Sequence, residues 1–217
     1  MNILVVANPD SQDEFKGKFG LKHQVIFKTS QQVSEKEVQM AQVIFDFEIH
    51  PESNHVSLYQ VKTDAVLFLN SVMTKVSKLV ASFGWPNPVI GFNGWAGMFN
   101  KPLMELTSPQ PEDVVRQICT HLGTDFRMVE DQLGMVSPRV VSMIINEAYY
   151  TLEEGTANES DIDLAMKLGT NYPAGPFEMA STIGTSKVCQ LLENLYSETS
   201  NPRYQVCPLL KQRSLDG

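Results

Sequence analysis

The segment Ser137–Gly155 reads SPRVVSMIINEAYYTLEEG and decides the character of the second half of the chain. Its apolar residues recur every three or four positions, which is the period of an α-helix. Ser137 and Pro138 are typical of a helix start, and Gly155 is typical of a helix end. The apolar stripe is too wide for a helix with one neighbour, so we expect burial on several sides. The segment therefore predicts a helical unit built around it.

Further helices are expected on both sides of this segment. Upstream, a helix runs from the start signal at Pro111 to the stop signal at Gly123, and a short strand is expected at Phe126–Val129. Downstream, start signals at Ser160, at Pro176 and at Thr185 or Ser186 predict three more helices. We expect an all-helical domain over residues 133–217.

The first half of the chain has a different hydrophobic pattern, in which short apolar runs alternate with polar segments. Continuous runs of four to six residues rich in Val, Ile and Phe are typical of buried parallel strands. Helical spacing over residues 73–80 indicates a crossover helix, so residues 1–132 should form an α/β domain. The predicted strands are Ile3–Ala7, Gln24–Lys28, Val43–Phe47, Ala65–Leu69 and Val89–Phe92.

Composition narrows the function classes. A net charge of -8 with 17 Lys and Arg among 217 residues argues against nucleic-acid binding, which needs a basic face. No apolar run approaches the roughly 18 residues of a membrane span, and no signal peptide precedes the first apolar run. Cys119, Cys189 and Cys207 have no metal-type or redox-type spacing. We expect a cytoplasmic protein without a metal site.

Five groups of residues in the helical half form a recognisable pattern. The groups are Asn146–Ala148, Glu154–Gly155, Asp161–Asp163, Ala165–Gly169 and Tyr172–Glu178. This pattern resembles the signature of the C-terminal domain of the 3-hydroxyacyl-CoA and 3-hydroxybutyryl-CoA dehydrogenases, and weaker similarity extends the match to residues 65–210.

The resemblance implies a truncated Rossmann-like, NAD-binding-type domain at residues 1–132. A 6-phosphogluconate-dehydrogenase-like helical domain at residues 133–217 would then form a homodimer. The reaction of the family is hydride transfer between NAD and the 3-hydroxyl carbon of an acyl-CoA, so the implied ligands are NAD and a CoA thioester of fatty-acid or hydroxybutyryl-CoA metabolism.

Ordinary NAD binding is nevertheless not expected. The turn after the first strand, Ala7–Gln12, has no glycine, although a dinucleotide needs a close approach of the backbone to its pyrophosphate. Ala7 and Asn8 hold the positions that would face the cofactor. Lys28 stands where the second strand should offer an acid to the ribose, and the family's long excursion after that strand is deleted.

The catalytic positions implied by the resemblance are substituted as well. Asn93 takes the place of the histidine base, Ser108 that of the orienting glutamate, and Ser71 lies beside the substrate-contacting serine position. Asn70 and Arg139 are retained and, with Trp95, are the predicted substrate-binding residues. Pro138 replaces the family's catalytic asparagine.

Two hypotheses follow from these losses. In the first, a divergent dehydrogenase uses Asn93, Ser71, Ser108 or His50. In the second, a pseudoenzyme uses the dimer to bind an acyl-CoA-like ligand or another protein. We favour the second, because neutral Asn93 cannot accept the proton of an alcohol.

Several residues allow two interpretations. Asp161 and Asp163 suit helix capping better than a metal site, and the Gly and Pro residues of 169–176 suit a turn between helices better than a binding site. His50, with Glu48 and Glu52, suits either a solvated loop or an acid/base cluster. The aromatic residues near Gly91–Gly97 either line a pocket for an acyl group or cover the core; they are Trp85, Phe92, Trp95 and Phe99, with Met98.

Overall fold

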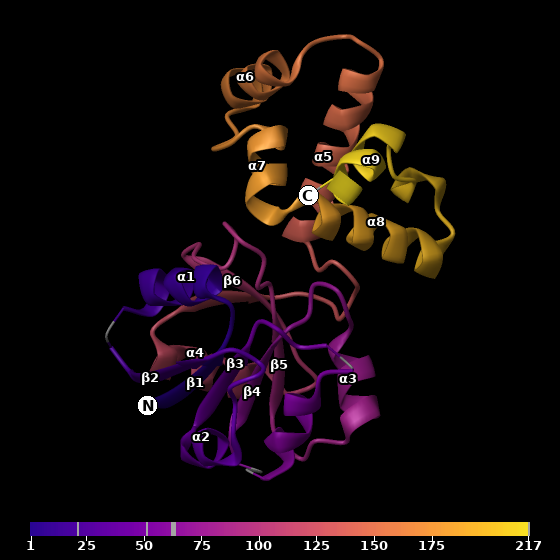
Figure 1. The fold of residues 1–217 in the computed structure, drawn as a ribbon. Helices are drawn as coiled ribbons and strands as arrows, with labels where there is room; N and C mark the ends of the chain where they lie inside the picture. The colour runs from indigo at the N-terminus through magenta and orange to yellow at the C-terminus, as the bar shows by residue number, and fades with distance from the viewer. Residues whose placement is uncertain (21, 51, 62–63, 217) are drawn as a thin grey trace. The chain divides into compact units, whose positions relative to one another are not determined.

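A computed structural model describes residues 1–20, 22–50, 52–61 and 64–216. The chain divides into two compact units, Met1–Met135 and Val136–Gly217 (Figure 1). The first unit contains a seven-stranded sheet of order β2-β1-β3-β4-β5-β6-β7, parallel except for the β5–β6 pair. The predicted parallel sheet is thus confirmed. Its strands are β1 (Asn2–Val6), β2 (Gln24–Lys28), β3 (Val43–Asp46), β4 (Val66–Asn70), β5 (Val89–Phe92), β6 (Leu103–Thr107) and β7 (Asp125–Met128).

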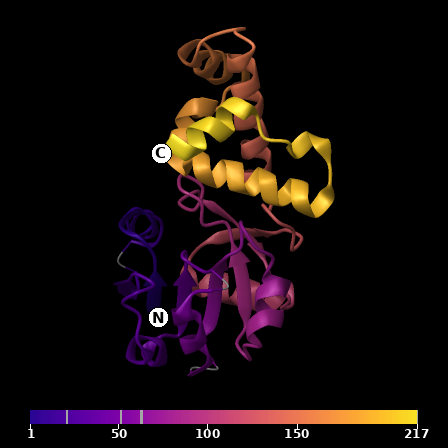
Figure 2. The ribbon, with the colours of Figure 1, turned by 45° about the vertical axis from the view of Figure 1, so that its right-hand side comes forward.

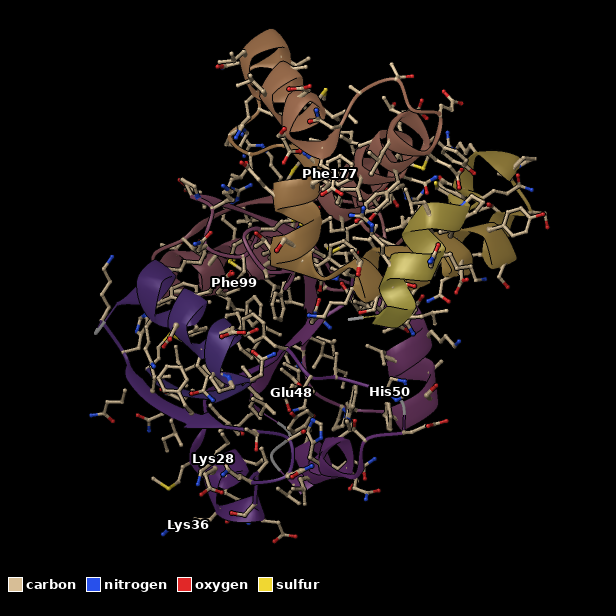
Figure 3. The ribbon with its side chains drawn as sticks, turned by 45° about the horizontal axis from the view of Figure 1, so that its top comes forward. Lys28, Lys36, Glu48, His50, Phe99 and Phe177 are labelled. Atoms are coloured by element: carbon tan, nitrogen blue, oxygen red, sulfur yellow. The ribbon has the colours of Figure 1, made fainter. Side chains whose placement is uncertain are left out.

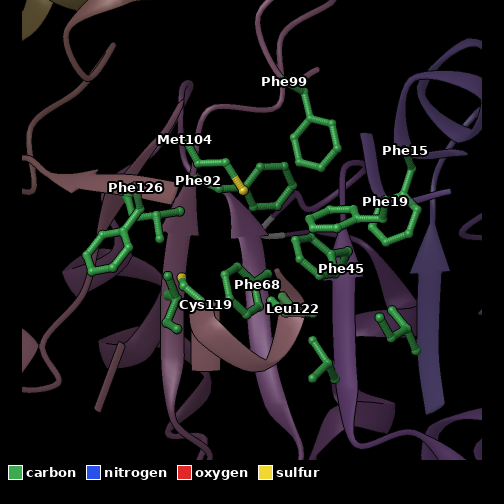
Figure 4. Packing of buried hydrophobic residues seen from close by; sticks show 14 of the residues in the cluster. Phe15, Phe19, Phe45, Phe68, Phe92, Phe99, Met104, Cys119, Leu122 and Phe126 are labelled. Atoms are coloured by element: carbon green, nitrogen blue, oxygen red, sulfur yellow. The ribbon is translucent and has the colours of Figure 1, made fainter. Parts of the chain in front are cut away.

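Helices bury both faces of this sheet, which explains why its strands are continuous apolar runs. On one face, α1 (Pro9–Phe19) and α4 (Glu112–Leu122) contribute to the core that Figure 4 shows in part. On the other face lie α2 (Glu35–Met40), the 3₁₀ helix η1 (Asn54–Val61) and α3 (Val76–Phe83). The chain passes from β1 to β2 on one side and places β3 on the other, so the strand order reverses between β1 and β3.

The second unit is helical, as predicted, and is built around α5 (Ser137–Glu153). α5 packs against α7, α8 and α9 (Figure 2), which accounts for its wide apolar stripe. Its N-cap is Val136, one residue before the expected cap. Among the described residues, no helix has the length and apolar character that crossing a membrane requires. The other helices are α6 (Glu159–Thr170), α7 (Pro176–Ile183), α8 (Thr185–Thr199), η2 (Pro202–Tyr204) and α9 (Pro208–Asp216).

Candidate active site at the carboxyl edge of the sheet

The β1–α1 turn satisfies its own backbone groups. Asn8 caps α1, because its Oδ1 accepts a hydrogen bond from the Ser11 amide at 2.9 Å, and Gln12 Nε2 donates to the Ala7 carbonyl at 2.8 Å. Pro9, in the first turn of α1, has no N–H to offer. A helix N-terminus binds phosphate through free amides. Here a side chain of the same turn already takes one of those amides.

Lys28 closes β2 beside the first turn of α2. Its Nζ lies 3.4 Å from Glu37 Oε1. A hydrogen bond from the Ser34 hydroxyl, with a smaller contribution from Lys28, lowers the pKa of Glu37 to about 2. The Lys28 cation is therefore paired with a carboxylate of its own unit. Glu48 lies two residues after β3, and its Oε2 accepts the Ser30 amide at 2.8 Å, which ties the loops after β2 and β3 together. Figure 3 labels both Lys28 and Glu48.

Asn70, at the end of β4, joins three neighbouring strand ends. Its Oδ1 accepts the Gly94 amide at 3.2 Å, and its Nδ2 donates to the Phe47 carbonyl at 3.3 Å. A Cβ on Gly94 would lie 2.8 Å from Asn70 Cγ, so this close approach requires glycine. The Asn70 amide thus holds the carboxyl edge of the sheet in shape.

Asn93 and Trp95 shape the loop after β5. Asn93 Oδ1 accepts the Trp95 amide at 3.2 Å, and its Nδ2 lies 3.5 Å from Met98 Sδ. The exposed fraction is 7% for Asn93 and 3% for Trp95. The side-chain amide of Asn93, the residue predicted to replace the base, is therefore engaged in a local turn.

Ser71 and Ser108 bond elsewhere. Ser71 is buried and its Oγ lies 3.6 Å from Met135 Sδ. Ser108 Oγ donates to the Val89 carbonyl at 2.7 Å and accepts the Gln110 amide at 3.0 Å. Neither hydroxyl is directed by these bonds at Asn93, so they supply no orienting group of the kind that a general base needs.

Arg139 belongs to the second unit and lines an open groove of about 400 Å³ there. Arg139 Nη1 lies 3.4 Å from the Tyr204 hydroxyl. Apolar side chains of α5 line the groove together with three charged side chains and a tyrosine. The lining residues are Arg139, Val140, Met143, Ile144, Glu147, Arg203 and Tyr204.

The retained motif residues cap helices and hold chain segments. Asp163 accepts the amides of Phe177 at 2.8 Å and Glu178 at 3.2 Å, so it caps α7 rather than its own helix. Asn146 donates to the Gln205 carbonyl and accepts the Cys207 amide, which fastens the segment before α9 to α5.

Asp131, in the segment that leads to α5, caps a helix of the first unit. Its two carboxylate oxygens accept the amides of Val76 and Ser77, each at 2.8 Å, at the start of α3. These bonds support the structural interpretation of the motif.

A buried polar cluster at the end of β3 was missed by the sequence reasoning. Asp46 Oδ2 lies 2.8 Å from both His55 Nε2 and the Tyr59 hydroxyl, and Asp46 Oδ1 accepts the Glu48 amide at 2.9 Å. Burial, reinforced by the Asp46 charge, raises the pKa of Tyr59 well above its usual value. An acid at the end of an apolar run, followed by His and Tyr four residues apart, was the available signal. His50, which the sequence suggested as part of an acid/base cluster, is exposed instead, and its Nδ1 accepts the Glu52 amide.

The aromatic residues around Gly91–Gly97 form core. The exposed fractions of Trp85, Phe92, Trp95 and Phe99 are 5% or less. Of the two interpretations of these residues, the structure supports core covering.

Comparison with known proteins finds a family match for the second unit. The family model described as the C-terminal domain of 3-hydroxyacyl-CoA dehydrogenase matches residues 134–217. The 3-hydroxyadipyl-CoA dehydrogenase of Escherichia coli is 42% identical over 108 residues, which are 48% of this chain and 23% of that protein. The 3-hydroxybutyryl-CoA dehydrogenase of Bradyrhizobium diazoefficiens is 31% identical over 158 residues, 69% of this chain and 53% of that protein. The chain spans about half the length, or less, of these curated relatives.

Solved structures extend the likeness to the fold of the whole chain. FadB2 of M. tuberculosis has a TM-score of 0.81 at 18% identity, covering 100% of this chain and 93% of that one. The (S)-3-hydroxybutyryl-CoA dehydrogenase PaaH1 of Ralstonia eutropha has a TM-score of 0.76 at 20% identity, covering 100% and 94%. At these identities the likeness establishes a shared architecture, a Rossmann-like unit followed by a helical unit.

Proposed function

Because the chain belongs to the 3-hydroxyacyl-CoA dehydrogenase family, we propose that it is a dehydrogenase-like protein that no longer transfers hydride to NAD. The observation that carries the proposal is the state of Asn93. A neutral amide cannot take the proton of a 3-hydroxyl group. The Asn93 amide also already accepts the Trp95 N–H and contacts Met98 Sδ. Ser71 and Ser108 bond elsewhere and add no base.

The residues present also do not fit the cofactor of the family. Asn8 takes an amide at the start of α1 that a pyrophosphate would need, and Lys28 pairs with Glu37 where a ribose acid is expected.

We further propose that the helical unit forms a homodimer that binds an acyl-CoA-like ligand. The support for the dimer is the groove along α5, where the apolar lining residue Val140 is 50% exposed. The support for the ligand class is the family, whose named relatives are dehydrogenases of CoA thioesters. The three cysteines are free and buried, which agrees with a reducing compartment such as the cytoplasm.

The test is thermal unfolding of the purified chain with NADH, acetoacetyl-CoA or free CoA added separately. A ligand that binds only the folded state raises the midpoint. We expect acetoacetyl-CoA to raise it, NADH to leave it unchanged, and no NADH oxidation when both are present. NADH oxidation that Asn93→Ala abolishes would instead establish a divergent dehydrogenase. No shift with either CoA species would remove the proposed ligand.

A further inference from the structure

In an open α/β sheet, ligands bind outside the carboxyl ends of the strands where the strand order reverses. In this chain that place lies between the loops that follow β1 and β3. The loop after β1 leads into α1, which carries Phe15, and Phe47 directly follows β3. A dinucleotide would have to enter between these two segments.

The ring of Phe99 packs against residues of both segments. Its centroid lies 4.8 Å from that of Phe47, 5.4 Å from that of Phe92 and 6.0 Å from that of Phe15. Phe99 thus contacts α1, the residue after β3 and the end of β5 at once. Figure 4 shows it on a loop beyond the arrowheads of the strands, and its exposed fraction is 2%.

Polar contacts to α1 hold the loop on both sides of Phe99. Glu14 Oε1 accepts the Gly97 amide at 2.7 Å, and Lys18 Nζ donates to the Lys101 carbonyl. Lys18 also lies 5.9 Å from the Phe99 ring centroid. Burial lowers the pKa of Lys18, in keeping with a lysine covered by this loop.

We propose that the loop Gly94–Lys101 is a built-in occupant of the nucleotide crevice, with Phe99 filling the space that the nucleotide would need. The proposal deepens the proposed function, because it gives the loss of NAD binding a steric cause besides the missing glycines. It also implies that restoring glycines to the β1–α1 turn would not restore NAD binding.

Trp95 reports on this loop directly. The chain has two tryptophans, and Trp85 Nε1 makes no hydrogen bond within the described residues, so Trp85→Phe should be tolerated and leaves Trp95 as a single fluorophore. In this background we expect acrylamide to quench Trp95 weakly, because the side chain is buried. We expect Phe99→Ala and Glu14→Ala each to raise the quenching constant several-fold, because each removes a contact that holds the loop.

The matched control is Asp13→Ala, since Asp13 neighbours Glu14 on α1 but pairs only with Lys16 among the contacts described. Circular dichroism identifies any variant that fails to fold, and Glu14→Ala then serves in place of Phe99→Ala. The proposal would be overturned if acrylamide quenched Trp95 strongly in the Trp85→Phe background itself, or if neither folded variant had a higher quenching constant. Saturable energy transfer from Trp95 to NADH would also overturn it. If the protein oxidised NADH while Trp95 stayed shielded from acrylamide and showed no energy transfer to NADH, only the proposed function would be contradicted.

Discussion

At the scale of single residues, the pair Asp163 and Gly175 gives the sharpest prediction. A Cβ on Gly175 would lie 2.2 Å from Asp163 Cγ, and Asp163 is fixed by the two α7 amides that it accepts. We expect Gly175→Ala to lower the free energy of unfolding by about 2–4 kcal/mol, because it displaces a buried cap. Urea denaturation measures the difference.

Gly169→Ala is the matched control, since a Cβ there meets nothing within 4 Å and the residue lies in α6. It should be neutral or stabilising by up to about 1 kcal/mol. Equal losses in the two variants would show that Asp163 does not constrain Gly175.

What the sequence reveals about single residues is their chemistry, not their direction. The absence of a base at residue 93 could be predicted, because asparagine is neutral whatever surrounds it. That its amide accepts the Trp95 N–H could not, since the bond depends on the fold of the loop. Asp163 likewise reads as a cap of its own helix, but it caps a helix that begins more than ten residues later.

At the scale of elements, the Asp46 cluster should fasten η1 to β3. Asp46 is fully buried and accepts three hydrogen bonds, two of them from His55 and Tyr59 of η1. Tyr59→Phe leaves a buried carboxylate with one donor fewer, which should lower the free energy of unfolding by about 1–3 kcal/mol. Tyr196→Phe, on the exposed side of α8, is the control and should change little.

We also expect Tyr59→Phe to change how the free energy of unfolding depends on pH. Burial raises the Tyr59 pKa, so as the pH passes the usual tyrosine value the unfolded chain ionises and the folded chain does not. The parent therefore loses stability in this alkaline range, and Tyr59→Phe should remove that part of the loss. Denaturation at neutral and alkaline pH tests this. An unchanged alkaline loss in Tyr59→Phe would contradict the assignment.

Elements were predictable where burial was two-sided. The five apolar runs that form β1 to β5 were recognised as strands because each of them packs against helices on both faces of the sheet. β6 went unrecognised, since it runs antiparallel to β5 and its Leu103 is 44% exposed. α1 was missed because only Phe15 and Phe19 of its residues are buried, so its helical period is weak.

At the scale of the whole molecule, composition argued against nucleic-acid binding, which stays a prediction, and motif spacing identified the helical unit. Neither reveals the loop proposed to fill the crevice, because it is held by contacts between residues far apart in the sequence, such as Glu14 and Gly97, which are more than eighty positions apart. The proposed homodimer is likewise a property of a surface, and it leads to the last prediction.

Val140 is half exposed on α5 and lines the groove together with the apolar residues Met143 and Ile144. If a second copy covers this groove, Val140→Asp places an unpaired carboxylate in the interface twice, once in each protomer, because a two-fold interface repeats every change. Size-exclusion chromatography with light scattering should then give a dimer for the parent and a monomer for Val140→Asp. Leu168→Asp is the control: Leu168 is 78% exposed on α6 and does not line the groove. A monomeric parent would remove the dimer, whereas a dimer that Leu168→Asp alone dissociates would move its interface from α5 to α6.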